Sequence, residues 1–205
     1  MRTRVKMCGI TSLEDARVCL DAGADALGFN FWPGSKRHVP VSRAVKIIES
    51  LPAGVLRVGV FVRASPEEVR RTVASVGLGA VQLHGDEDPS EYVGAGVPLW
   101  QVLRIETSLP DSVSDRASEL LLDARAEGFG GSGRSFDWSL AHQARRFGLP
   151  FWLAGGLTPL NVAEAVRRAA PDGVDVASGV ESSPGVKDPE RVRAFVAAVR
   201  AAEER

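Results

Sequence analysis

The chain has few of the residues that would place it in a specialised class of protein. Its two cysteines, Cys8 and Cys19, are too few for a disulfide scaffold. No C-x-x-C or H-E-x-x-H motif predicts a metal site. The net charge of -1 supplies no basic field for nucleic acid, and no apolar run approaches the ~20 residues of a membrane helix. With no secretory segment at its start, we expect a cytoplasmic protein that binds neither nucleic acid nor membrane.

Lysine, asparagine and glutamine are also scarce. The sequence holds 4 Lys, 2 Asn and 3 Gln, although Lys and Arg together number 25. Low contents of Asn, Gln, Cys and Met fit a heat-adapted protein from a thermophile. GC-rich coding DNA would equally explain the excess of arginine over lysine, so both explanations stay open.

What the sequence does contain is a regular alternation of short apolar runs and longer amphipathic stretches. Eight strands are expected, at Arg4–Cys8, Ala26–Asn30, Arg57–Val62, Ala80–Leu83, Leu99–Leu103, Glu119–Asp123, Phe151–Ala154 and Gly173–Ala177. Apolar strands that alternate with helices indicate a parallel sheet covered by helices. Eight such units predict an α/β protein whose single domain, residues 1–205, is a (β/α)8 TIM barrel with mostly short loops. The alternative is an open doubly wound sheet.

Helix starts carry recognisable capping signals. Pairs that place a capping residue before proline occur at Ser65-Pro66, Asp88-Pro89, Thr158-Pro159 and Asp188-Pro189. Thr11 or Ser12 is expected to cap the first helix. Two loops are longer than the rest, Phe31–Pro40 and Ala124–Phe136, and both follow strands, at the end of a barrel where function resides.

Cys8 ends the first strand, at the rim where barrels carry their chemistry. The alternative is a buried cysteine with a purely structural role, which is the role we expect for Cys19 on the first helix. At the rim, a nearby helix N-terminus is expected to lower the pKa of the Cys8 thiol. Its thiolate then suits the role of a nucleophile or a general base.

Asp123 ends the sixth strand, directly after three leucines. A solvated surface carboxylate explains this position poorly, whereas a capping or ion-paired residue remains an alternative. A partly buried aspartate at the rim is expected to have a raised pKa and to serve as a general acid.

Glycine-rich turns follow the last three strands. They are Gly130–Gly133 with Gly131, Ser132 and Gly133, then Gly155 and Gly156, then Ser178 and Gly179. Loops after strands 7 and 8 often form the phosphate site of a barrel. The spacing therefore predicts an anion site, although any tight turn favours glycine.

Two further side chains are expected near the same rim. Arg37 lies in the long loop after strand 2 and is either a solvated arginine or a ligand for a carboxylate through two parallel hydrogen bonds. His84 ends strand 4 and either contacts a substrate or satisfies a loop. His142 is expected within a helix, at the surface.

Several stretches together resemble one enzyme family. They are KMCGI at 6–10, GADALGFNF at 23–31, SKR at 35–37, VQLHG at 81–85, LLLDA at 120–124, GGSGRSFDW at 130–138, LAGGLTPLNV at 153–162 and DVASGVESSPGVKD at 175–188. In these motifs, which span nearly the whole chain, the sequence resembles the phosphoribosylanthranilate isomerases of tryptophan biosynthesis.

The resemblance implies an isomerase that converts N-(5-phosphoribosyl)anthranilate to 1-(2-carboxyphenylamino)-1-deoxyribulose 5-phosphate by an Amadori rearrangement. It assigns Asp123 as the acid that opens the ribose ring and Cys8 as the base that removes the C2 hydrogen. It also implies that Arg37 holds the anthranilate carboxylate and that the glycine-rich turns hold the phosphate. No metal or other cofactor is expected. The partner is a small phosphorylated substrate, and the chain is a monomer or a homodimer.

Two other classes of function remain to be weighed against this one, namely another enzyme on the same barrel and a barrel without catalytic activity. A related phosphoribosyl isomerase would carry paired aspartates at strands 1 and 5, but strand 1 ends in Cys8 and Leu99–Leu103 holds no acid. The synthase for the next tryptophan intermediate would need a lysine at the rim, and the only strand lysine is Lys6, inside strand 1. A non-catalytic phosphate-binding barrel would need neither Cys8 nor Asp123. A second, related isomerisation by the same site is left open.

Overall fold

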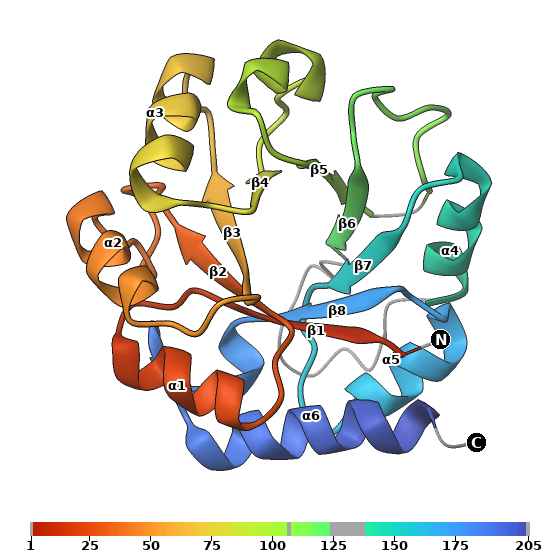
Figure 1. Cartoon of the computed structure of the whole chain (residues 1–205). Coiled ribbons are helices and arrows are strands. Elements are labelled where there is room, and N and C mark those ends of the chain that lie inside the picture. The colour runs from red at the N-terminus through yellow and green to blue at the C-terminus, as the bar shows by residue number, and fades with distance from the viewer. Residues whose placement is uncertain (1, 106–107, 124–137, 204–205) are drawn as a thin grey trace.

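The computed structural model describes residues 2–105, 108–123 and 138–203 and shows a closed parallel barrel (Figure 1). Each strand pairs with the next along the chain, and the last pairs with the first. The strands are β1 (Arg4–Cys8), β2 (Ala26–Asn30), β3 (Leu56–Phe61), β4 (Ala80–Leu83), β5 (Leu99–Arg104), β6 (Glu119–Asp123), β7 (Phe151–Ala154) and β8 (Gly173–Val176). The predicted barrel is therefore confirmed, with β3, β5 and β8 differing from their expected bounds by one residue.

Helices form the outer layer around this barrel (Figure 1). They are α1 (Leu13–Asp21), α2 (Val41–Glu49), α3 (Pro66–Val76), α4 (Trp138–His142), α5 (Val162–Ala169) and α6 (Pro189–Glu203), with 3-10 turns η1 (Pro89–Ala95), η2 (Gln143–Phe147) and η3 (Ser178–Val180). His142 is exposed, as expected, but it ends its helix. A short hairpin of β9 (Glu181–Ser183) and β10 (Val186–Lys187) follows η3 and was not predicted.

Most of the predicted capping residues are found in place. Ser12 and Ser65 accept hydrogen bonds from backbone N–H groups in the first turns of α1 and α3. Asp88 does the same for η1, and Asp188 for α6. The expectation for Thr158 is wrong, because α5 begins only at Val162 and Thr158 belongs to the preceding turn.

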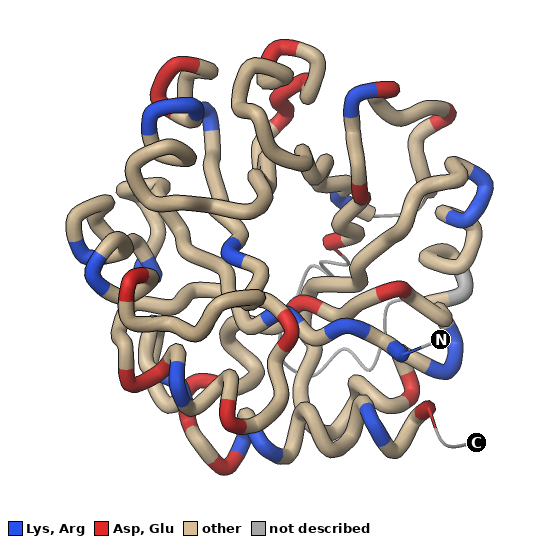
Figure 2. Tube along the Cα trace, viewed as in Figure 1, with Lys and Arg blue, Asp and Glu red and all other residues tan. Residues whose placement is uncertain are grey.

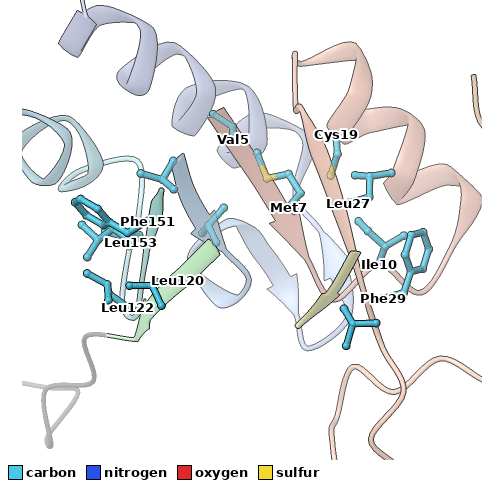
Figure 3. Close-up of a cluster of buried hydrophobic side chains, with 14 of the residues drawn as sticks. Val5, Met7, Ile10, Cys19, Leu27, Phe29, Leu120, Leu122, Phe151 and Leu153 are labelled. Carbon is cyan, nitrogen blue, oxygen red and sulfur yellow. The ribbon is translucent and has the colours of Figure 1, made fainter. Parts of the chain in front are cut away.

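Side chains alternate between the two faces of the sheet. Val5, Met7 and Leu27 face outward and pack with the buried Cys19 of α1 (Figure 3).

Charged residues of both signs are interspersed over the helical layer (Figure 2). Among the described residues, no helix has the length and apolar character needed to cross a bilayer.

Two tryptophans fill the part of the barrel interior that lies away from the rim. Trp100 and Trp152 are fully buried, and their rings stack with centroids 4.8 Å apart. Arg4 lies over the Trp152 ring at 4.5 Å and pairs with Glu119 at 2.6 Å, and Glu119 also accepts the indole N–H of Trp152. Rings of this size fit only because a small residue, Gly173, stands beside Trp152 in the neighbouring strand.

We expect Gly173→Ala to destabilise the protein. A Cβ atom at this position would lie 2.3 Å from the Trp152 ring, so the stacked pair must shift. Overpacking of this kind costs about 1–3 kcal/mol in the free energy of unfolding. Urea denaturation measures it, with Gly94→Ala as the matched control because a Cβ there meets nothing within 4 Å. Equal stability of the two variants would contradict the packing argument.

Candidate active site

A cavity of about 730 Å³ opens at the carboxyl ends of the strands. A volume of this size suits a small ligand. The structure brings most of the predicted site residues to its wall, namely Cys8, Arg37, His84, Asp123, Gly155, Gly156 and Ser178. Gly179 lies in η3, beside the wall, and the predicted Gly131, Ser132 and Gly133 lie outside the described residues.

Cys8 lies at the end of β1, and its surroundings determine the acidity of its thiol. Burial raises the pKa of Cys8 above the usual value of a cysteine, and the negative charge of Asp175 adds to this. Lys6 and Lys187 oppose the shift without cancelling it. The expectation that a helix N-terminus lowers this pKa is therefore wrong, because desolvation outweighs the nearby positive charges.

Gly28 makes room for the thiol. A Cβ atom on Gly28 would lie 2.9 Å from Cys8 Sγ and 3.1 Å from Lys6 Cε. The thiol and the lysine stem therefore share one narrow space inside the barrel, bounded by the neighbouring strand β2.

Lys6 is an ammonium group enclosed within the barrel. Its side chain is fully buried, and Nζ donates to Asp175 Oδ1 and to Gln82 Oε1, each at 2.9 Å. Burial by itself would lower the pKa of Lys6, but Asp175 and Cys8 outweigh it and raise this pKa. The lysine is thus held in its charged form between β4 and β8.

The charge of Lys6 determines the orientation of two further side chains. An ammonium group only donates, so the Gln82 oxygen must face it and the Gln82 amide N–H group must face away. That amide group lies 3.1 Å from His84 Nδ1, which must therefore accept. The imidazole proton then resides on Nε2, which points at Asp123 Oδ2 at 3.6 Å. His84 is thus held by Gln82 and faces Asp123.

Asp123 ends β6 and is 5% exposed, which agrees with its position after three buried leucines. Its side chain shares the cavity wall with Cys8. β1 and β6 are not neighbours in the barrel, so the carboxylate and the thiol approach the cavity from separate strands. A ligand that occupies the cavity can contact both.

The turns after β7 and β8 form another part of the wall. Gly155 and Gly156 have φ angles of 89° and 65°, so both need the left-handed conformation that glycine adopts freely. Close packing requires glycine at position 179, because a Cβ atom there would lie 1.9 Å from the Leu157 carbonyl oxygen. The two turns therefore touch each other beside Ser178.

Arg37 lies at the edge of the cavity and is not the freely solvated side chain considered above. Its guanidinium group forms an ion pair with Glu181 at 2.6 Å. Its stem lies against Gly9, where a Cβ would meet Arg37 Cδ at 2.5 Å. Arg37 is thus held next to the residue that follows Cys8.

Sequence reasoning missed four polar residues of this site, Gln82, Asp175, Glu181 and Lys187. It noticed Lys6 but gave it no role. The sequence could have revealed the three strand residues. Lys6, Gln82 and Asp175 are polar residues that interrupt otherwise apolar strands, at positions that face the barrel interior. Among the described residues, no three His, Cys, Asp or Glu side chains gather as metal ligands.

Known proteins resemble this chain over nearly its whole length. The family model described as N-(5'phosphoribosyl)anthranilate (PRA) isomerase matches residues 5–198. The N-(5'-phosphoribosyl)anthranilate isomerase of Myxococcus xanthus is 50% identical over 98% of this chain and 97% of its own. The structures of phosphoribosyl anthranilate isomerase from Thermus thermophilus and Thermotoga maritima have TM-scores of 0.87 and 0.85, with 39% and 38% identity. Each of these two alignments covers 97% of this chain and 99% of the other.

The raised pKa of Cys8 predicts slow alkylation at neutral pH. Only the thiolate reacts, so the rate with iodoacetamide should keep rising with pH beyond the ~8.5 of a free cysteine. The Cys8→Ser variant gives the background from Cys19, which is buried and has a pKa raised to about 12. A rate that levels off at or below pH 8 would contradict the dominance of burial at this site.

Proposed function

This chain belongs to the N-(5'-phosphoribosyl)anthranilate isomerase family, and we propose that Cys8 and Asp123 are the base and the acid of its reaction. The observation that carries the proposal is that both side chains line one cavity at the carboxyl ends of the strands, with Arg37 at its edge. Function in barrels of this kind is located at that end.

The reaction is an isomerisation within tryptophan biosynthesis. N-(5-phosphoribosyl)anthranilate becomes 1-(2-carboxyphenylamino)-1-deoxyribulose 5-phosphate in an Amadori rearrangement. Protonation of the ribose ring oxygen breaks its bond to C1 and leaves a C1–nitrogen iminium. Loss of the C2 hydrogen gives an enolamine, and protonation at C1 with loss of the C2 hydroxyl proton gives the ketone. C1 is reduced and C2 is oxidised, so the reaction needs no external oxidant or reductant.

Asp123 is the proposed acid for ring opening. It is almost fully buried, and the Nε2–H group of His84 faces one of its oxygens at 3.6 Å. This contact orients the carboxyl group, which in the proposal gives a proton to the ribose ring oxygen. This contact supports a positioning role for His84 towards Asp123, beside the substrate contact expected above.

Cys8 is the proposed base for the C2 hydrogen. The iminium nitrogen makes this hydrogen acidic, since it accepts the electron pair that the base leaves behind. A thiolate whose pKa is raised by burial is a stronger base than an ordinary cysteine thiolate. Lys6, charged and adjacent, stabilises that thiolate once it has formed. No metal or organic cofactor is needed, because the substrate nitrogen is the electron sink.

The two ends of the substrate are both anionic. We assign the phosphate to Gly155, Gly156, Ser178 and Gly179, together with Gly131, Ser132 and Gly133, which lie outside the described residues. Arg37 is assigned to the anthranilate carboxylate. With its ends held, the ribose lies between β1 and β6, where proximity to both groups lowers the barrier.

The proposal also covers the location of the protein, its heat adaptation and its oligomeric state. The chain acts in the cytoplasm on a small phosphorylated substrate, and its composition suits a heat-adapted enzyme. It is a monomer or a homodimer, which is supported by the phosphoribosylanthranilate isomerase of Thermotoga maritima, whose structure is described as a dimer converted to monomers.

We expect Cys8→Ser and Asp123→Asn each to lower kcat/KM by ~10²-fold or more, because each removes one proton-transfer step. The measurement is the loss of anthranilate-type fluorescence with freshly generated substrate. Cys19→Ala and Asp21→Asn are matched controls, since Cys19 packs in the core and Asp21 is exposed on α1.

Turnover by Cys8→Ser at the wild-type rate would leave the reaction in place and remove Cys8 as its base. Full activity of Asp123→Asn would do the same for the acid. Controls as impaired as the site variants would show that the losses reflect folding.

A further inference from the structure

Three hydrogen bonds join the side chains of Arg37 and Glu181 in an ion pair. Arg37 Nε donates to Glu181 Oε1 at 2.8 Å and to Oε2 at 3.1 Å, while Nη2 donates to Oε2 at 2.6 Å. The Glu181 side chain is 3% exposed and that of Arg37 is 25% exposed. A bidentate, charge-assisted pair of this kind fixes the plane of the guanidinium group as well as its position.

This pairing determines which donors of Arg37 remain for a ligand. A guanidinium group carries five N–H donors in a rigid fork. Glu181 occupies the side formed by Nε and Nη2. Within the part of the chain that the structure describes, the end formed by Nη1 and the second Nη2 hydrogen has no other partner. Two parallel donors at that end match the two oxygens of a carboxylate.

Glu181 is itself held in place by the buried side chain of Lys187. Lys187 Nζ, fully buried, donates to Glu181 Oε1 at 3.0 Å and to the Cys8 carbonyl oxygen at 2.6 Å. Arg37 and Lys187 together outweigh the effect of burial and lower the pKa of Glu181. The carboxylate therefore stays charged, and the three groups share a net positive charge that attracts an anion.

The β9–β10 hairpin joins these groups to the rest of the rim. Glu181 opens β9 and Lys187 ends β10. Thr11 donates to the Gly185 carbonyl of the same hairpin at 2.6 Å, and the Lys187 N–H donates to Asp15 at 3.1 Å. The hairpin is thus fastened to the segment that follows Cys8, and Arg37 is fixed relative to β1.

We propose that Glu181 is a positioning residue, which orients Arg37 so that its free end recognises the carboxylate of the substrate's arylamine. The inference rests on the proposed assignment of Arg37 to that carboxylate. In this proposal, the site prefers a carboxylated arylamine because of the Arg37–Glu181 pair, and not because of Arg37 alone.

Glu181→Asp separates orientation from charge. The negative charge remains, but the carboxylate is withdrawn by one carbon–carbon bond, about 1.5 Å, so it cannot keep its contacts with Arg37 and Lys187. Removal of the charge, as in Glu181→Gln, would leave two cations unopposed and strengthen the attraction of any anion. That gain would conceal a loss of orientation.

The experiment compares two ligands by calorimetry. One is reduced 1-(o-carboxyphenylamino)-1-deoxyribulose 5-phosphate, and the other is the same molecule without its carboxylate. We expect the wild-type protein to prefer the carboxylated ligand and Glu181→Asp to lose about tenfold of this preference, ~1.4 kcal/mol. Affinity for the uncarboxylated ligand should not change, which also shows that the variant is folded. Glu190→Asp, an exposed position in α6, is the matched control.

Other outcomes would overturn the inference in distinguishable ways. An unchanged preference in Glu181→Asp would show that Arg37 needs no orientation by Glu181. Equal weakening of both ligands would assign Glu181 to structure alone. A wild-type protein without preference, and an Arg37→Met variant identical to it, would instead overturn the assignment of Arg37, and this inference with it.

Discussion

The buried ammonium group of Lys6 determines how the part of the site around Cys8 and Asp123 is arranged. An unpaired charge inside a protein costs several kcal/mol, so the barrel must supply partners for it. Asp175 supplies a counter-charge and Gln82 a carbonyl oxygen, each at 2.9 Å. The register between β1 and β8 sets Lys6 opposite Asp175 and so supplies this counter-charge.

The charge of Lys6 affects the surroundings of both proposed reacting groups, Cys8 and Asp123. On one side, its charge lies beside the Cys8 thiol and opposes the effect of burial. On the other, it fixes the Gln82 amide, which fixes the proton on His84 Nε2 and directs it at Asp123. The proposed base and the proposed acid lie on separate strands, and one network of contacts through Lys6, Gln82 and His84 links them. Arg37 is held by Glu181, and Glu181 is held in turn by Lys187.

The sequence was most informative where local rules suffice. Apolar runs marked all eight strands, and Asp123 stood out because a carboxylate follows three leucines. Ser12 and Ser65 cap helices as predicted, whereas Thr158 does not, because Asn161 and Val162 start α5 later. The pKa of Cys8 was predicted in the wrong direction, since desolvation depends on neighbours distant in sequence. The partners of Lys6 and Arg37 lie far along the chain, so spacing could not reveal them.

The most direct test of this account is the tautomer of His84, read by NMR from protein labelled with 15N-histidine. The chain has 3 histidines, and the His84→Asn variant identifies the signals of interest. We expect one tautomer, with Nε2 protonated and Nδ1 bare, because Lys6 orients Gln82. A proton on Nδ1, or an even mixture of tautomers, would contradict the claim that the buried lysine arranges the site.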